Sequence, residues 1–227
     1  MSAHQSHGRT AASIAELGAL TRSLAERYET IFSTFRAEAQ ARADEAATLV
    51  DAALGVIELL SAVGLAYGEH FPNQRSIDCA AGCAACCHLA VATPPGVAAM
   101  IASYITAHFT DEERGALMAR LRDAAAIVEA ADDPARLRLR CPLLGPDERC
   151  GVYPVRPISC RAFTSPSRAL CRRLVFEVTD ETGISQHPAL FRFHQDATTA
   201  LQRTARNRGQ PAAQEMLAPA LIRALEA

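Results

Sequence analysis

Apolar residues return at helical spacing along the first third of the chain, where no proline occurs from Ala11 to Tyr67. The repeating positions are Ile14, Leu17, Leu20, Leu24, Tyr28, Ile31 and Phe35, followed by Leu49, Ala53, Ile57, Leu60, Val63 and Tyr67. This period predicts helix. The stripe is thin from Arg36 to Asp44, so the pattern allows either one helix of roughly 80 Å or two helices that meet there. Two glycines and Pro72 end the run.

Two helices are predicted in the middle of the chain. Pro94 and Pro95 open the first, which runs from Val97 to about His108, with proline in the first turn, where its missing N–H costs nothing. The segment 110–113, Thr-Asp-Glu-Glu, has the pattern of a capping box and opens the second helix. This helix runs to residue 130 and carries three apolar residues at helical spacing, Leu117, Leu121 and Ile127.

The last third predicts an irregular stretch followed by helices. The segment 132–134, Asp-Asp-Pro, stops the preceding helix, and residues 138–173 contain five prolines. Residues 174–178, Leu-Val-Phe-Glu-Val, predict a short strand. A helix is expected from Pro188 to Asn207, with one apolar face formed by Leu190, Phe193, Ala197 and Leu201. Another helix follows Pro211, and Pro219 should kink or break it. The fold class is therefore mainly α.

Composition and charge narrow the functional classes. The chain has 227 residues, 49% of them hydrophobic, so it can bury a real core. Its formal charge is −2 and all 23 basic residues are arginine, without a long run of like charge. We therefore expect no nucleic-acid partner and no membrane partner. The N-terminus lacks a secretion signal and no segment has eighteen uninterrupted apolar residues, which predicts a cytoplasmic protein.

Cysteine is concentrated in two groups. The eight cysteines are Cys79, Cys83, Cys86, Cys87, Cys141, Cys150, Cys160 and Cys171. Disulfides are disfavoured in a reducing cytosol, whereas clustered thiolates are typical ligands of zinc, iron and iron–sulfur clusters. All eight are candidate metal ligands. They suit two four-coordinate sites, or one cluster with spare cysteines, and the helices at 97–130 allow the two groups to meet.

The adjacent pair Cys86 and Cys87 leaves two arrangements open. In an extended backbone, neighbouring side chains point to opposite sides, so one thiol would face a first centre and the other a second centre or the core. A turn would instead bring both to a single metal. His88 follows directly and could add an imidazole ligand or support the site from outside.

Arginines flank the cysteines at positions 75, 149, 156, 161, 172 and 173. Eight deprotonated thiols would lower the formal charge from −2 to −10, and two divalent ions would return it to −6. The arginines can offset part of the remainder. Arg156 and Arg161 bracket Cys160 most closely and favour its thiolate.

Both cysteine groups carry a family resemblance. The first segment is Cys79-x3-Cys83-x2-Cys86-Cys87. The second begins with Cys141-Pro-x-Leu and continues through 150–161 with the signature Tyr-x-x-Arg-Pro-x-x-Cys-Arg. In these two segments the chain resembles the bacterial YkgJ-type cysteine cluster family. The resemblance covers about residues 76–175 and implies a zinc- or iron-chelating domain. The same cluster is similar to part of the flagellin lysine N-methylases, which implies a link to iron–sulfur and S-adenosylmethionine chemistry. The first three cysteines also have the spacing of radical S-adenosylmethionine enzymes, but the strand–helix repeat of that superfamily is missing.

Three parts of the chain follow from these patterns. Residues 1–70 form a long helix or helix pair, 71–178 a cysteine-cluster metal-binding domain with an irregular core, and 179–227 the C-terminal helices. The leading hypothesis is a protein that chelates zinc or iron, with a [4Fe-4S] cluster as one form of the centre. The alternatives are an iron–sulfur-dependent enzyme such as a protein lysine N-methylase, and a zinc-structured interaction module.

No nucleotide loop, paired-carboxylate motif or serine–histidine elbow occurs. Tyr153, Arg156 and His88 are therefore the candidate auxiliary residues of an enzyme. S-adenosylmethionine as a cofactor depends on the resemblance alone. The N-terminal helix is the expected contact surface for a protein partner or a homodimer.

Overall fold

The computed structural model describes residues 3–70, 76–80, 82–177, 184 and 186–227, with side chains before residue 25 at 16, 18, 19 and 21–23. The helices are α1 (Ala3–Glu45), α2 (Leu49–His70), α3 (Val97–His108), α4 (Asp111–Glu129), α5 (Ile158–Ala162), α6 (Arg168–Phe176), α7 (Pro188–Asn207) and α8 (Leu217–Glu226). Short 3-10 turns are η1 (Ala85–His88), η2 (Pro134–Arg136) and η3 (Tyr153–Val155). Two-residue strands β1 (Ala92–Thr93) and β2 (Glu215–Met216) pair antiparallel. The mainly α prediction is confirmed.

The N-terminal run is a helical hairpin. Thr48 caps α2: its hydroxyl accepts from the Asp51 N–H at 3.1 Å, and the Asp51 carboxylate accepts from the Thr48 N–H at 3.1 Å. Arg208, just after α7, closes the turn from the other side. Its guanidinium donates to the carbonyl oxygens of residues 43, 44, 46 and 47, at 2.6 to 3.4 Å. These bonds satisfy carbonyls that the end of α1 leaves without helical partners.

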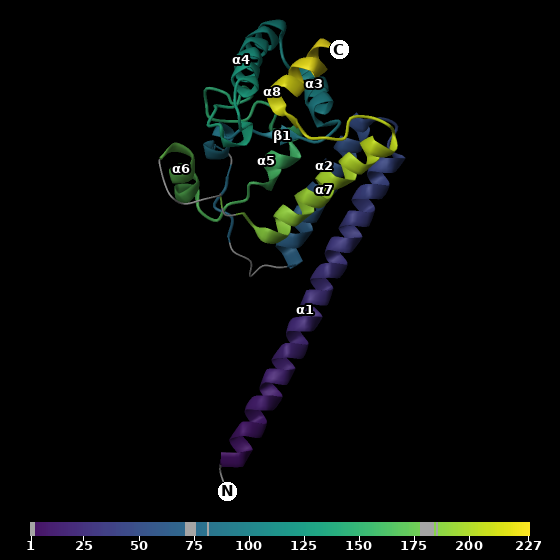
Figure 1. The fold of residues 1–227 in the computed structure, drawn as a ribbon, viewed down its shortest axis with the longest axis vertical. Coiled ribbons are helices and arrows are strands. Elements are labelled where there is room, and N and C mark those ends of the chain that lie inside the picture. The colour runs from purple at the N-terminus through teal and green to yellow at the C-terminus, as the bar shows by residue number, and fades with distance from the viewer. Residues whose placement is uncertain (1–2, 71–75, 81, 178–183, 185) are drawn as a thin grey trace.

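The core of the hairpin is aromatic. Phe193 of α7 is 1% exposed, and its ring lies 4.9 Å from Phe32, 5.0 Å from Phe35 and 6.1 Å from Tyr67, centroid to centroid. The predicted apolar face of α7 is therefore confirmed, because Phe193, Ala197 and Leu201 are all buried. In Figure 1, α7 lies along α2 and the upper half of α1.

A second group contains α3, α4 and α8 (Figure 1). The capping box of Thr110 and Glu113 is confirmed, and α4 buries Leu117 and Leu121. Ile127 faces outward at 44% exposure, so its predicted place on the apolar face is wrong. The predicted role of Pro94 and Pro95 is also corrected. They precede Gly96, which caps α3 with a φ of 81° and lies so close to Leu49 that an added Cβ would overlap its backbone.

Two other predictions fail for identifiable reasons. The segment 174–176 belongs to α6 rather than to a strand, because Cys171, Leu174 and Val175 bury one helical face against η1. Pro219 does not kink the last helix, because α8 begins only at Leu217 and a proline is tolerated in the first turn. Residue 178 of the predicted strand lies outside the described residues.

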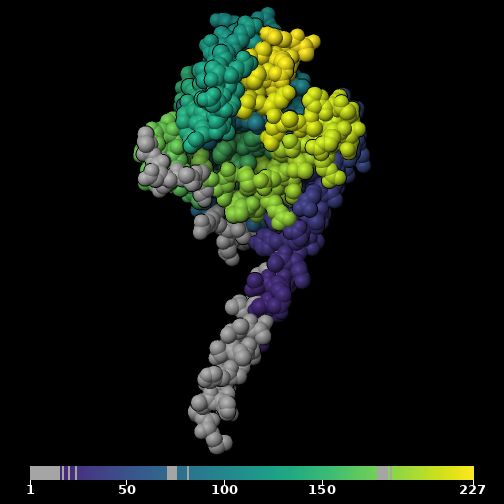
Figure 2. Space-filling view, viewed as in Figure 1, coloured from purple at the N-terminus to yellow at the C-terminus, as the bar shows by residue number. Residues whose placement is uncertain are grey.

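The long N-terminal helix leaves the body, and its purple part projects from the rounded mass in Figure 2. The predicted side chains Ile14, Leu17, Leu20 and Leu24 lie outside those that the structure describes, as do Pro72 and Arg75. Among the described helices, α2 is long and apolar enough to cross a membrane by length and composition alone. Here it packs against α1, α3 and α7 and buries six of its residues, as a core helix does. The three-part division of the chain stays a prediction.

Candidate metal centre

The first cysteine segment is fastened to the loop before α6. The N–H groups of Asp78 and Cys79 both donate to the carbonyl oxygen of Ser165, at 3.0 and 3.2 Å. The Asp78 carboxylate accepts from the N–H of Arg168 at 2.9 Å and forms an ion pair with its guanidinium at 3.1 Å. These bonds hold Cys79 beside α6.

A 3-10 turn carries the adjacent thiols. Cys86 and Cys87 both belong to η1, whose N-terminal bond runs from the Cys87 N–H to the Ala84 carbonyl at 2.9 Å. The two thiols line the same cavity and share a side-chain hydrogen bond. The extended arrangement with opposite orientations is therefore absent here, and the structure has the turn arrangement.

His88 is placed outside this cavity. Its Nδ1 lies 3.1 Å from the Ala84 carbonyl oxygen, and its ring packs edge-on against Phe176 at 4.8 Å. It does not line the wall that the cysteines form. The imidazole thus braces η1 against α6.

Backbone pairing joins the second cysteine group to the first. The Leu139 N–H donates to the His88 carbonyl at 2.9 Å, and the Cys141 N–H donates to the Cys87 carbonyl at 2.7 Å. A tight hairpin then pairs Leu144 with Cys150 and brings the chain back. The prediction that the helices at 97–130 return the chain to the first group is confirmed.

Seven of the eight cysteines line one cavity of about 360 Å³. They are Cys79, Cys83, Cys86, Cys87, Cys141, Cys150 and Cys160. The remaining wall is partly apolar, with Leu143, Phe163 and Leu217, and partly polar, with Arg149 and Arg156. Residues from three separate parts of the chain, 77–91, 141–164 and Leu217, thus surround one space.

Cys171 is the cysteine that the cavity does not include. It is buried on α6 with Ala85 and Val175, and Cys83 packs against this small cluster. Its placement makes Cys171 the weakest of the eight predicted ligands. It lies behind the cavity wall rather than in it.

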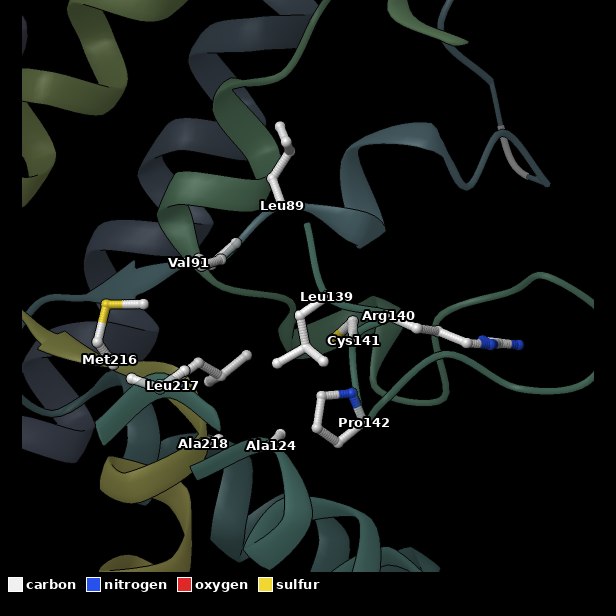
Figure 3. A pocket seen from close by; sticks show the side chains of 12 residues that line it. Leu89, Val91, Ala124, Leu139, Arg140, Cys141, Pro142, Met216, Leu217 and Ala218 are labelled. Atoms are coloured by element: carbon white, nitrogen blue, oxygen red, sulfur yellow. The ribbon is translucent and has the colours of Figure 1, made fainter. Parts of the chain in front are cut away.

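Cys141 lines more than one cavity. Besides the thiol cavity, it lines an apolar cavity of about 40 Å³ with Leu89, Leu139 and Leu217, shown in Figure 3. The side chain of Arg140 points away from this cavity in Figure 3. The thiol of Cys141 is thus deeply set and backed by hydrocarbon.

Burial and mutual repulsion disfavour free thiolates. Burial raises the pKa of Cys141 to about 11 and raises the pKa of Cys160 well above its ordinary value, where the charges of Cys141, Cys86 and Cys150 add to the effect. The hydrogen bond that the Cys86 thiol donates to Cys87, then burial, raises the pKa of Cys86. Several thiolates in one cavity need a cation to be stable.

The two arginines that bracket Cys160 differ in their surroundings. The Arg161 Nε donates to the Arg156 carbonyl at 3.1 Å, and its Nη2 donates to the Pro154 carbonyl at 2.6 Å. Arg156 instead lines the cavity, with its Cζ 4.7 Å from the centre of the Tyr153 ring. The sequence did not distinguish these roles, because they depend on how the loop at 153–161 folds.

The donor set of the cavity fits a thiophilic metal. Soft thiol sulfur suits zinc, iron and iron–sulfur clusters. Among the residues that the structure describes, no three histidine, cysteine or carboxylate side chains stand close enough to hold an ion as they are. Each cysteine sulfur moves by rotation about one side-chain torsion, and coordination would require the thiols to move closer together.

Comparison with known proteins supports the same chemistry. Residues 78–183 match the family model CxxCxxCC, described as "Putative zinc- or iron-chelating domain". The match includes all eight cysteines and excludes α1, α2, α7 and α8. This part of the chain is therefore similar to domains of that description, in agreement with the predicted chelation of zinc or iron. No curated protein and no solved structure is significantly similar to the chain.

Proposed function

We propose that this protein binds zinc or iron through the thiolates of the seven-cysteine cavity. The observation that carries the proposal is the convergence of seven cysteines, from segments far apart in sequence, on one space of about 360 Å³. Bound metal would supply the positive charge that these buried thiols otherwise lack.

Four thiols are the best candidates for the principal ligands. The pKa of Cys160 is raised by burial and by the charges of Cys141, Cys86 and Cys150, and these four thiols lie within range of one another's charge. Cys86 also affects the pKa of Cys79 and of Cys171, where burial is again the main cause. Cys86 is therefore the thiol common to both cysteine groups. We propose it as the central ligand, with Cys79, Cys83 and Cys87 completing this centre or a second one.

Metal analysis of the whole chain tests the proposal. Protein purified without oxygen is analysed for zinc, iron and acid-labile sulfide, and its visible spectrum is recorded. Colourless protein with zinc supports a structural role, whereas brown protein with iron and sulfide supports a cluster. The absence of metal under reducing, metal-replete conditions would refute metal binding altogether.

Single substitutions test the ligand assignment. Cys86→Ser should abolish most metal binding, because it removes the shared thiol. Cys171→Ser is the matched control and should retain it, because Cys171 is buried outside the cavity. Equal losses in the two variants would contradict the assignment of Cys86 as the central ligand.

An iron–sulfur enzyme is the second candidate. The cavity is larger than a single ion needs, which favours a cluster over one zinc ion. A protein lysine N-methylase activity, with S-adenosylmethionine as cofactor, depends on the likeness of the cysteine pattern. Methyl transfer to a lysine-containing protein, assayed with the iron-loaded protein, would test it.

We also propose that α1 contacts a protein partner or a second copy of the chain. The support is its projection from the body in Figure 1. Light scattering of the whole chain in solution tests the homodimer: a monomeric mass across the micromolar range would exclude it. A cytoplasmic location stays a prediction from the sequence.

A further inference from the structure

Arg156 has a charged side chain whose hydrogen-bonding capacity the protein does not use in full. The residue follows η3 and lines the thiol cavity, and its guanidinium is stacked on the Tyr153 ring at 4.7 Å. Its Nε is buried and has no hydrogen-bond partner among the described residues. A buried donor without a partner costs free energy, more so in a charged group. We therefore expect an acceptor for the Arg156 Nε–H in the cavity.

The neighbouring arginine shows that the loop itself does not need this donor. Arg161 already holds the backbone of the 154–156 turn through two hydrogen bonds. The two arginines of the signature therefore have separate roles. Arg161 fixes the loop, and Arg156 lines the cavity with the cysteines.

The cavity offers sulfur as the acceptor. Arg156 lines the cavity together with seven cysteines, among them Cys79, Cys86, Cys150 and Cys160. The carboxylate on the same wall, Glu148, is exposed and is paired with Arg140 at 3.2 Å. The thiolates are therefore the groups to which Arg156 can donate a hydrogen bond.

We infer that Arg156 is a positioning residue of the metal centre, which donates its Nε–H to a ligand sulfur and offsets the negative charge of the centre. The inference rests on the proposed metal binding. Four thiolates around one divalent ion carry a net formal charge of about −2. A guanidinium with a buried Nε at this place stabilises that charge and fixes the orientation of the sulfur that accepts the bond.

Metal affinity tests the inference in the whole protein. Zn²⁺ binding is measured by competition with a chromophoric chelator for the wild type, Arg156→Gln, Arg156→Lys and Arg149→Gln. Loss of an outer hydrogen bond to a metal ligand typically weakens binding by about 10–100-fold, and this is expected for both Arg156 variants. Lysine keeps the charge but lacks the fixed planar donor. Arg149→Gln is the control, because Arg149 lines the same cavity but is exposed, so its affinity should stay within about twofold of wild type.

A spectrum separates this role from a purely structural one. In Co²⁺-substituted protein, loss of a hydrogen bond to a thiolate moves the sulfur-to-metal charge-transfer band to lower energy. The shift is expected in Arg156→Lys and Arg156→Gln and is absent in Arg149→Gln. If Arg156→Gln fails to fold by circular dichroism, Arg156→Lys decides the question by the same two measurements.

The failures of the two proposals are distinguishable. Wild-type protein that binds no Zn²⁺ refutes the proposed function itself. Wild-type protein that binds Zn²⁺, together with an Arg156→Lys variant of unchanged affinity and unchanged band, refutes the role of Arg156 alone. An equal loss in Arg149→Gln also refutes it, because any nearby positive charge would then suffice.

Discussion

The surroundings of Gly96 leave no room for a side chain larger than hydrogen. Its φ is 81°, and an added Cβ would lie 2.0 Å from the carbonyl oxygen of Leu49. Both the backbone conformation and the close approach of α2 therefore require glycine. The position fixes where α3 begins relative to the helical hairpin.

Replacing Gly96 with alanine should destabilise the protein strongly. The left-handed conformation costs about 1–2 kcal/mol for a residue with a Cβ, and overpacking against Leu49 adds about 1–3 kcal/mol. Urea unfolding measures the loss. Gly209→Ala is the control, because Gly209 has a φ of 67° but an added Cβ would meet nothing within 4 Å. Equal losses in the two variants would show that the contact with Leu49 contributes nothing.

His194 makes stability depend on pH. Burial is the main reason that its pKa falls to about 4, and the charges of Arg161 and Arg156 lower it further. In the unfolded chain the pKa returns to about 6.5, so the unfolded state binds the proton more tightly. Stability contributed by the neutral ring is complete above pH 6.5 and is lost as the pH falls toward 4, with a loss of about 2 kcal/mol by pH 5.

His194→Gln should remove this dependence. Urea unfolding of both proteins without metal, under reducing conditions at pH 7.5 and pH 5, gives the comparison. The wild type should lose about 2 kcal/mol more than the variant between these pH values. An equal loss in both proteins would assign the pH dependence to other groups.

At the scale of residues, the sequence predicted that the cysteines come together, but not how the residues around them are buried and hydrogen-bonded. Clustered thiols are visible as a pattern, and seven of them share the cavity. The buried Nε of Arg156 is not visible in this way, because it depends on the path of the loop around it. The anchoring bonds from Ser165 to Asp78 and Cys79 join positions more than eighty residues apart and have no local signal.

At the scale of elements, the turn between α1 and α2 is held by a residue that lies far away in the sequence. Arg208 donates to the carbonyl oxygens of Ala43, Asp44, Ala46 and Ala47. Asp44 is held nearby by the Thr204 hydroxyl, whose hydrogen bond keeps the pKa of this carboxyl below its usual value. The end of α7 thus fixes the end of α1.

Arg208→Ala should destabilise the hairpin by about 1–3 kcal/mol, the usual range for hydrogen bonds to a charged group. The matched control is Arg206→Ala, which removes the same charge from an exposed position in the last turn of α7. That variant should lose no more than about 0.5 kcal/mol. Thermal unfolding measures both, and a similar loss in the two variants would point to general charge rather than to the carbonyl bonds.

Helices were predictable wherever their apolar period was long. The bounds of α3 and α7 agree with the periodicity, and the capping box of α4 was readable from four residues. The strand predicted at 174–178 failed because a short apolar run does not distinguish the two periods, and packing against η1 decided for helix. The apolar pattern did not decide between one helix and two in the N-terminal run, although the capping pattern Thr48-x-x-Asp51 was present to indicate the break between α1 and α2.

At the scale of the whole molecule, two kinds of packing hold the chain together. The layer of α1, α2 and α7 is built on aromatic and aliphatic contacts without a cysteine in these helices. The described residues of 76–91 and 131–167 are largely loops and short turns around the thiol cavity, fastened by single backbone bonds such as Cys141 to Cys87. The first part needs no metal to bury its core, whereas the second surrounds a space that metal would fill.

Removal of metal should therefore loosen the molecule unevenly. A ligand present at a hundred times its dissociation constant stabilises the state that binds it by about 2.7 kcal/mol, and chelation removes this contribution. Because the proposed ligands lie at 79–87 and 141–160, local opening should increase there and in α6, which packs on η1. Amide protons of α2 and α7 should remain protected, because these helices pack mainly against α1 and against each other. Hydrogen exchange with mass spectrometry, before and after chelation under reducing conditions, measures this, and an equal rise of exchange throughout the chain would show that the thiol cavity and the helical layer unfold as one unit.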